Sequence, residues 1–306
     1  MSFCLTAQTI STSPTTPPDD TPKFTVSIPD PRDCMPARAT AAGGRNRLHP
    51  LYGGCLVDAS PITSSAATSW TKITLESVKP ECAVTFNKRQ SSFAGLSVKT
   101  GRMMSGLGPH EHAVWRELES NPRWVDFDLQ NIRTSWSDGH GGHSYTGDWI
   151  AVDHDGVVHA GEIKASASYY ADPAYHILME EAASAYARVG IAFSRDTGDG
   201  IRGGQRRQLN VGRAFGDRFT AVPDDRRQAV IQTIEASGGT AALGKVEEVA
   251  HENARVARAM VNAMMCARDV SYPLDARLDG NTSVTLPITP TTVVDIRAMR
   301  HELTNY

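Results

Sequence analysis

The order of apolar and polar positions is most regular in the middle of the chain, between about residues 108 and 194. Segment 108–120 opens with Gly-Pro and repeats apolar residues at helical spacing, so it predicts a helix. In segment 124–132 apolar and polar residues alternate, which is typical of a half-buried strand. Segment 144–165 predicts two strands joined by a turn at His-Asp-Gly, and segment 173–190 predicts an amphipathic helix followed by a strand. The predicted order is helix, strand, strand, strand, helix, strand.

The two ends of the chain have a different character. Residues 1 to about 40 are dense in Ser, Thr, Pro and Asp, so we predict a flexible leader there. Segment 67–78 has the pattern of a strand, although Gly and Pro interrupt its surroundings. The Arg- and Gly-rich segment 201–218 is typical of a connector. The residues that follow it predict two or three helices and a short strand near 283–288.

These changes of pattern divide the chain into three parts. Residues 1–85 form a flexible Ser/Thr/Pro-rich leader and an irregular N-terminal segment, residues 86–215 form a domain that mixes helices and strands, and residues 216–306 form a small, mostly helical domain. A chain of 306 residues has the length of one large or two ordinary domains. The sequence therefore predicts an α/β fold with a helical C-terminal domain.

Composition excludes several classes of protein. Apolar residues make up 40% of the chain, and 31 Lys and Arg stand against 34 Asp and Glu, a net charge of −3. A disordered, collagen-like or supercharged protein would differ from this balance. The near-neutral charge would also argue against a nucleic-acid partner. However, the basic residues are unevenly placed, so the total alone does not decide this question.

Cysteine usage and hydropathy indicate the compartment. The five cysteines are scattered and never form a C-x-x-C pair, which predicts reduced thiols and neither a disulfide framework nor a cysteine-based zinc site. No apolar run approaches 18 residues, and the first 20 residues lack the pattern of a secretory signal. We therefore expect a soluble, cytoplasmic protein without a membrane segment.

The most informative local feature is Asp148, which is followed fourteen residues later by Glu162-Ile163-Lys164. Residues i and i+2 of a strand share a face, so Glu162 and Lys164 point the same way. If the turn comprises residues 154–156, the numbers of paired residues sum to 310, and Asp148 lies opposite Glu162 on the same face. A two-residue Asp-Gly turn would shift the register by one residue and separate them.

Two carboxylates that converge from adjacent strands suit a hard cation such as Mg²⁺. Lys164 beside them could stabilise charge on a phosphorane or orient an attacking water in metal-assisted hydrolysis. Glu111 adds a third carboxylate on the otherwise apolar face of the preceding helix, where an unpaired charge is costly. The alternative is a solvated sheet face, because acidic and basic residues recur at such spacings by chance.

At these residues the sequence resembles the TnsA-type transposon-end endonucleases, which belong to the PD-(D/E)XK restriction-endonuclease-like group. The resemblance covers about residues 86–215, and five pieces occur in the family's order. They are Glu111 in PHEHAVWRELE, Asn121-Pro122, Gln130 in FDLQ, Tyr145-Thr146-Gly147-Asp148 and Glu162-Ile163-Lys164. The main departure is Gly147, where the family motif usually has Pro. An inactive relative is an alternative, but its key carboxylates are all present.

The resemblance implies roles for these residues. Asp148 and Glu162 would be metal ligands, with the backbone carbonyl of Ile163, and Lys164 would be the catalytic lysine. Glu111, the acidic residue carried by the helix, would be a catalytic residue and a third metal ligand. Gln130 would act in structure or near the substrate. The metal would be Mg²⁺, with Mn²⁺ as a substitute.

The resemblance also implies a fold, a substrate and partners. The core would be a restriction-endonuclease-like mixed sheet flanked by helices, and the C-terminal domain would be winged-helix-like. The function would be Mg²⁺-dependent hydrolysis of double-stranded DNA at transposon ends, alongside a DDE transposase subunit and an AAA+ regulator. Two alternatives stay open: a nuclease of phage or host DNA repair or restriction, and a non-catalytic DNA-binding adaptor.

Histidines and basic residues complete the list of candidates. Seven of the ten histidines fall between residues 110 and 176, and H-E-H and H-G-G-H could suggest zinc, although solvated loop histidines explain them as well. Two basic stretches flank the predicted nuclease core, and such side chains contact DNA phosphates. The alternative is a solvated linker. The candidate DNA-binding residues are Lys88, Arg89, Lys99, Arg102, Arg206 and Arg207.

Overall fold

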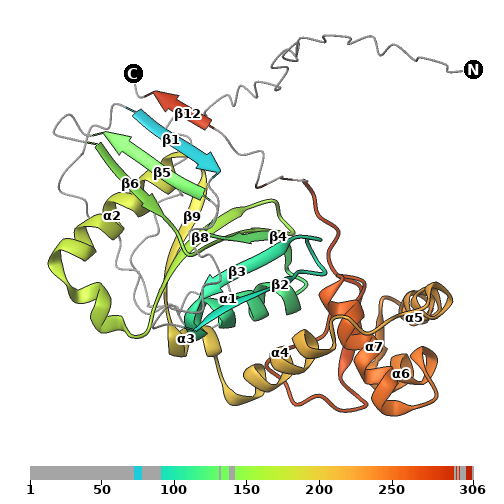
Figure 1. Ribbon diagram of the computed structural model, residues 1–306. Coiled ribbons are helices and arrows are strands. Elements are labelled where there is room, and N and C mark those ends of the chain that lie inside the picture. The colour runs from blue at the N-terminus through green and yellow to red at the C-terminus, as the bar shows by residue number, and fades with distance from the viewer. Residues whose placement is uncertain are drawn as a thin grey trace, which may run out of the picture. The chain divides into compact units, whose positions relative to one another are not determined.

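A computed structural model describes residues 72–77, 91–130, 132–137, 142–292, 294, 296 and 301–304 (Figure 1). The predicted flexible leader and the candidate DNA contacts Lys88 and Arg89 lie outside the described residues. The described part mixes helices and strands, so the predicted α/β class is confirmed. None of its helices combines the length and the apolar character needed to cross a membrane.

The central sheet follows the predicted order of elements. Its strand order is β4-β7-β8-β9, with β8 and β9 parallel and the other neighbours antiparallel. One helix precedes β4 and another connects β8 to β9, so this sheet and its two helices have the order helix, strand, strand, strand, helix, strand. Two strands that the sequence pattern did not predict, β5 (Ile132–Ser137) and β6 (Gly142–Thr146), stand between β4 and β7 in the chain and belong to another sheet. The elements are α1 (Gly108–Ser120), β4 (Trp124–Leu129), β7 (Trp149–Asp153), β8 (Val158–Lys164), α2 (Pro173–Arg188) and β9 (Ile191–Thr197).

The two helices cover opposite faces of this sheet. Alternate residues of a strand point to opposite faces, and β7 shows this clearly. Trp149 and Ala151 pack with the apolar face of α1, whereas Ile150 and Val152 pack with α2. All four β7 side chains are 2% exposed or less. The sheet is therefore a buried middle layer, and only the ends of its strands can present polar groups to a substrate.

Strand β4 departs from simple alternation. A β-bulge between Trp124 and Asp126 shifts its register with β7, so Trp124 is fully buried and Val125 is not. The alternation predicted for segment 124–132 would place Val125 on the buried face with Phe127 and Leu129, and this is wrong at that one position. Asp128 is buried as well, close to the guanidinium of Arg102.

A second sheet crosses the predicted domain boundaries. Its strand order is β12-β1-β5-β6, and all neighbours are antiparallel. Strand β1 comes from the predicted leader segment and β12 from the predicted C-terminal domain, so both ends of the chain contribute to it (Figure 1). The strands are β1 (Lys72–Ser77), β5 (Ile132–Ser137), β6 (Gly142–Thr146) and β12 (His301–Thr304), and a separate hairpin consists of β2 (Ser92–Leu96) and β3 (Met103–Leu107).

The C-terminal region contains the predicted helices and the predicted short strand. The prediction of a connector at 201–218 is wrong, because α3 and α4 occupy it. Helix α4 contacts both α1 and α7, and it links the central sheet to a separate helical core. The elements are η1 (Ala167–Ala171), α3 (Gly198–Arg202), α4 (Gln205–Asp217), α5 (Asp224–Ala236), β10 (Thr240–Ala242), α6 (Leu243–Ala250), α7 (Ala254–Cys266) and β11 (Ser283–Thr285).

Candidate active site

The β7–β8 hairpin has the register that brings the acidic pair together. Trp149 pairs with Gly161 and Val152 with Val158, so the numbers of paired residues sum to 310, the register expected for a turn of residues 154–156. One step further, the Asp148 N–H donates to the Gly161 carbonyl at 2.9 Å. The side chain of Asp148 accepts a hydrogen bond of 2.7 Å from the backbone N–H of Ile163. Asp148 therefore lies opposite Glu162 at the open end of the hairpin.

Glu162 is the most enclosed group of the site, with 4% of its surface exposed. Its Oε1 accepts a hydrogen bond of 2.6 Å from the Tyr175 hydroxyl on α2 and an ion pair from Lys164. Its Oε2 accepts a hydrogen bond from the Tyr145 hydroxyl on β6. A charged carboxylate at this depth needs such partners. Two tyrosines and a lysine thus hold Glu162 in one orientation.

A third tyrosine fixes the backbone of the site. The Tyr170 hydroxyl lies between the carbonyl oxygens of Glu162, at 3.0 Å, and of Asp196 on β9, at 2.7 Å. Tyr170 and Tyr175 stack on one another, with their ring centroids 6.1 Å apart. The sequence resemblance singled out Tyr145 but neither of these two. Both come from the 3₁₀ turn η1 and the first turn of α2, directly after Lys164.

Burial and like charge set the electrostatics of the pair. Burial, followed by the negative charge of Glu162, raises the pKa of Asp148 well above its ordinary value. For Lys164, burial acts to lower the pKa, but the hydrogen bond and charge of Glu162 outweigh it and raise the pKa overall. Burial and the negative charge of Glu162 raise the pKa of Tyr145 and Tyr175 as well. Lys164 is therefore a cation and the tyrosines are neutral donors at neutral pH.

Glu111 approaches the same site from α1. Its Oε2 accepts hydrogen bonds from the Leu107 backbone N–H at 3.0 Å and from the Gln130 side-chain amide at 3.1 Å. Burial is the main cause of its raised pKa, and the charges of Glu162 and Lys164 also act on it. Across the described ranges, however, no three His, Cys, Asp or Glu side chains are grouped closely enough to hold a metal ion. The structure thus brings Glu111 near the pair, and its role as a third metal ligand stays a prediction.

Gln130, whose side chain donates to Glu111, also has a strained backbone. Its φ of 51° is unusual for a residue other than glycine, and its N–H donates to the Asp148 carbonyl at 3.1 Å. The residue therefore connects the backbone of Asp148 to the side chain of Glu111. This placement agrees with the expected structural or substrate-side role.

Two glycines allow the strands of the site to approach closely. A Cβ atom on Gly161 would lie 2.4 Å from the indole of Trp149, so only glycine fits there. A Cβ atom on Gly147 would lie 3.3 Å from the Gly161 carbonyl oxygen, tighter than an ordinary contact. The residue that departs from the family motif therefore occupies a crowded position, and glycine suits its geometry.

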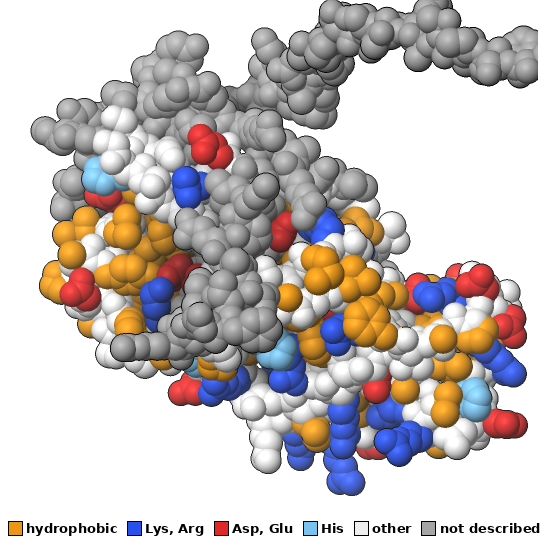
Figure 2. All heavy atoms as spheres, in the orientation of Figure 1, with side chains coloured by type: hydrophobic (Ala, Val, Ile, Leu, Met, Phe, Trp, Pro, Cys, Tyr) orange, Lys and Arg blue, Asp and Glu red, His pale blue; other side chains and the backbone are white. Residues whose placement is uncertain are grey.

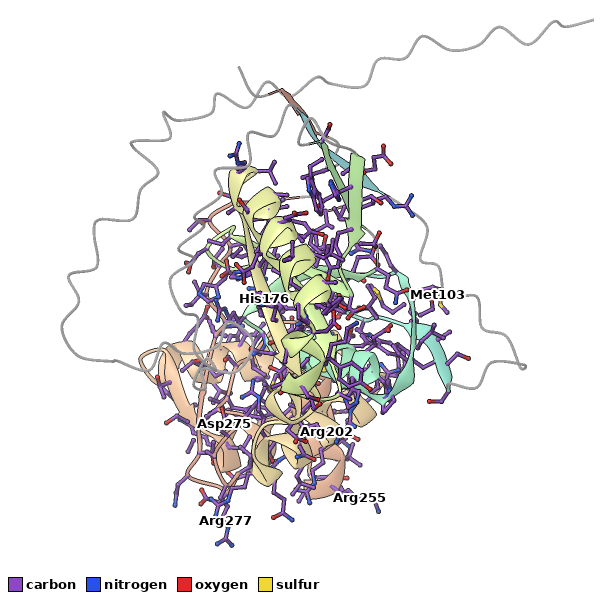
Figure 3. The ribbon with its side chains drawn as sticks, turned by 90° about the vertical axis from the view of Figure 1, so that its left-hand side faces the viewer. Met103, His176, Arg202, Arg255, Asp275 and Arg277 are labelled. Carbon is purple, nitrogen blue, oxygen red and sulfur yellow. The ribbon has the colours of Figure 1, made fainter. Side chains whose placement is uncertain are left out.

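The histidines do not form a zinc site within the described residues. His176 is exposed on the outer face of α2, as a solvated histidine should be (Figure 3). His159 is different: it is buried in β8 and lies 3.0 Å from the carboxylate of Asp153. The ring of His110 packs against Gly198, where a Cβ atom would clash with it. His140 lies outside the described residues.

Three of the predicted DNA contacts already have partners within the protein, so DNA would have to compete for them. The Lys99 ammonium donates to the carbonyls of Leu118 and Asn121 at the end of α1, and burial lowers its pKa to about 8. Arg102 pairs with Asp126 on β4. Arg207 is 5% exposed, and its contacts are described below. Arg206, by contrast, is exposed.

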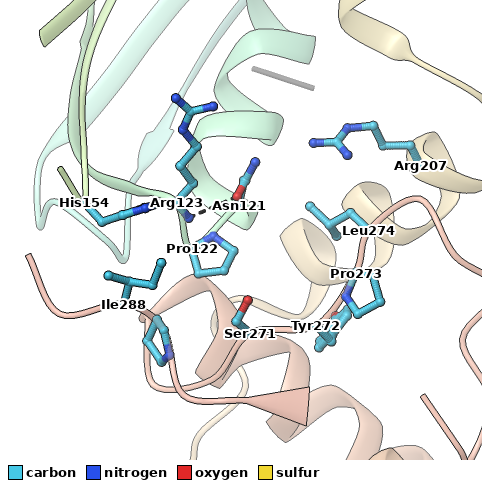
Figure 4. A pocket seen from close by; sticks show the side chains of 11 residues that line it. Asn121, Pro122, Arg123, His154, Arg207, Ser271, Tyr272, Pro273, Leu274 and Ile288 are labelled. Carbon is cyan, nitrogen blue, oxygen red and sulfur yellow. Dashed lines mark hydrogen bonds between the residues drawn. The ribbon is translucent and has the colours of Figure 1, made fainter. Parts of the chain in front are cut away.

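Arg207 joins the helical region to α1. Its guanidinium contacts the buried carboxylate of Glu117 through two nitrogens and reaches Asp275 at 2.6 Å. It also lines a cavity of about 250 Å³ between the end of α1 and the 271–274 segment (Figure 4). The second cation in this cavity, Arg123, pairs with Asp153 at 3.1 Å. Both arginines that line the cavity therefore already have carboxylate partners.

No protein-family model matches the chain, and no curated protein matches it.

Proposed function

We propose that this protein is a metal-dependent DNA endonuclease that hydrolyses phosphodiester bonds at transposon ends. The observation that carries the proposal is the convergence of Asp148, Glu162 and Lys164 at the open end of one hairpin. Two carboxylates placed side by side repel each other and destabilise the fold, but together they can bind a cation. Their placement argues against a merely solvated sheet face.

The donor set fits a hard divalent cation. Asp148 and Glu162 would hold Mg²⁺ or Mn²⁺ through carboxylate oxygens, and the bound ion would supply Lewis-acid polarisation of the phosphodiester. Lys164 stays protonated beside them, so it would stabilise negative charge on the phosphoryl group rather than remove a proton. Tyr175 and Tyr145 hold the Glu162 carboxylate in place before the ion binds.

The topology supports the finer fold proposal. The order α1, β4, β7, β8, α2, β9, with a mixed sheet between the two helices, agrees with the restriction-endonuclease-like core that the motif resemblance implies. The helical region with the two-stranded β10–β11 ribbon agrees with a winged-helix-like domain. In this proposal a DDE transposase subunit and an AAA+ regulator act alongside the protein.

A nicking assay tests the proposal. Supercoiled DNA that carries the transposon ends is incubated with the protein and Mg²⁺ or Mn²⁺. Wild type should nick it, whereas Glu162→Gln and Lys164→Ala should lose at least about a hundredfold in rate, since each removes a group from the reacting centre. Glu248→Gln, an exposed carboxylate on α6, is the matched control and should keep full activity. Equal activity in wild type and both site variants would exclude this site.

The adaptor alternative makes the opposite prediction. A non-catalytic DNA-binding protein would bind DNA without a divalent metal, and its DNA affinity would not change after loss of Asp148. A nuclease of repair or restriction would keep the site but nick DNA that lacks transposon ends. Substrates with and without ends distinguish these alternatives.

A further inference from the structure

A second cavity, of about 220 Å³, lies between α1, α3 and α4. Two cations line it, Arg116 from α1 and Arg202 from α3, together with His112 and Gln208. It is separate from the hairpin that carries the acidic pair and separate from the cavity at Arg207. The walls thus bring positive charge from two helices into one cavity that is open to solvent.

Neither arginine has a counterion among the residues that the structure describes. Within the part of the chain that the structure describes, Arg116 and Arg202 form no ion pair and no hydrogen bond. Other buried and half-buried arginines do form ion pairs: Arg207 pairs with Glu117, Arg227 with Asp269 and Arg258 with Glu247. A half-buried cation without a partner is unfavourable, and an anion that enters the cavity would remove that cost.

Arg116 is held in position by apolar contacts. Its guanidinium carbon lies 6.0 Å from the centroid of the Phe215 ring, a cation–π distance. Its Nη2 atom lies so close to α4 that a Cβ atom on Gly212 would be 2.4 Å away. A guanidinium fixed in this way loses little further freedom when it binds a ligand.

The acidic residues near the cavity do not cancel this charge. Glu117 also lines the wall, but both of its oxygens accept hydrogen bonds from Arg207. Asp199 on α3 is exposed and forms no ion pair with Arg202 in the described residues. The cavity therefore keeps a net positive character, and further basic side chains lie on the same side of the molecule in Figure 2.

One wall of the cavity is connected directly to the candidate active site. Thr197 pairs with Lys164 across β9 and β8, and α3, which carries Arg202, begins at the next residue. Arg116 lies on the same helix as Glu111, about 7.5 Å further along its axis and on another face. A DNA strand carries a phosphate about every 3.4 Å of helix axis, so a strand in the site would pass the cavity within a few nucleotides.

We propose that Arg116 and Arg202 form a binding site for a backbone phosphate of the DNA strand, a few nucleotides from the bond that is cut. This inference rests on the proposed function and assigns the path of the substrate. The guanidinium groups suit phosphate because each offers several donors in a planar fork. Arg206 and Arg213 on the exposed face of α4 extend the basic surface beyond the cavity.

DNA binding in EDTA tests this site apart from cleavage. Fluorescence anisotropy with a labelled duplex should show a roughly tenfold weaker affinity for Arg116→Gln and for Arg202→Gln, the effect of one charge-assisted contact. The slope of log affinity against log salt should fall by about 0.9 for each variant. Arg255→Gln on α7 removes the same charge from an exposed site and should change neither quantity (Figure 3).

Several outcomes would overturn the proposal. One is that the double variant with Arg116→Gln and Arg202→Gln keeps the affinity and salt slope of wild type. Another is that Arg255→Gln loses as much DNA affinity as Arg116→Gln and Arg202→Gln do. Arg202→Gln alone decides the question if Arg116→Gln unfolds. Thermal stabilisation by inorganic phosphate alone, lost in the double variant while DNA affinity stays, would assign the cavity to free phosphate instead. If these outcomes occur while Glu162→Gln still abolishes nicking, the cavity assignment fails and the proposed function stands. If wild type neither binds nor nicks DNA, both fail.

Discussion

Replacing Asp148 with Asn should make the metal-free protein more stable at neutral pH. Asp148 and Glu162 face each other across two antiparallel strands, where Cβ atoms are about 5 Å apart. At an effective dielectric constant of about 20, two negative charges at that distance repel by about 3 kcal/mol. Lys164 offsets part of this. An Asn oxygen can still accept the hydrogen bond from Ile163.

We therefore expect Asp148→Asn to raise the free energy of unfolding by about 1–3 kcal/mol at pH 8 in EDTA. The sign follows from the raised pKa of Asp148, which burial and the Glu162 charge cause. The folded protein binds this proton more tightly than the unfolded chain, so wild-type stability falls as pH rises toward the folded pKa. The gain should shrink as pH is lowered from about 8 to about 4, where both states become protonated.

Chemical denaturation at several pH values measures this effect. Each kcal/mol should also raise the melting temperature by about 2–4 °C. Asp155→Asn, in the exposed turn of the same hairpin, is the matched control and should change stability by less than about 0.5 kcal/mol. A destabilised Asp148→Asn variant, or a gain that does not depend on pH, would refute the reasoning that two like charges are forced together.

Three further substitutions test other parts of the structure by denaturation. Arg207→Gln should cost about 3–5 kcal/mol, because it leaves the buried Glu117 carboxylate without its cation; a loss below about 1 kcal/mol would contradict this. Gly161→Ala should cost about 1–3 kcal/mol, since the added methyl meets an indole 2.4 Å away, and wild-type stability would disprove the close packing. Tyr175→Phe keeps the ring but loses a hydrogen bond to a carboxylate, so we expect a loss of about 1–2 kcal/mol, and an unchanged melting curve would count against that bond.

The elements that the sequence predicted well are those whose periodicity reflects a single apolar face. Helix α1, the β7–β8 hairpin and helix α2 belong to this class, and the hairpin turn ends at Gly156, whose φ of 80° explains the glycine. The register of this hairpin decides the candidate site. The sequence left two registers open, because the turn length sets which residues pair, and the structure has the one that brings Asp148 opposite Glu162.

Helix α4 was missed because polar residues occupy its buried positions. Arg207 pairs with Glu117, and Asn210 donates to the carbonyls of Leu274 and Ala276 at 2.8 and 2.9 Å. Such satisfied polar groups are stable in a core, yet they remove the apolar period that marks a helix.

The sequence pattern also did not predict which residues from distant parts of the chain contact each other. Strand β12 pairs with β1 across more than two hundred residues, and no local signal indicates this pairing. In the site, Tyr175 reaches Glu162 from another element, and Lys99 is buried against the end of α1. A basic or aromatic residue shows its type in the sequence but not which neighbour it meets in the fold.

A calorimetric titration with Mn²⁺ tests the central claim most directly. Wild type and Asp155→Asn should bind one ion at the hairpin, whereas Asp148→Asn and Glu162→Gln should bind at least about tenfold more weakly, because each lacks a charged ligand. Binding should strengthen as pH rises, since the raised pKa of Asp148 means that a proton must leave first. No Mn²⁺ binding by wild type, or equal binding by all four proteins, would contradict a metal site at Asp148 and Glu162.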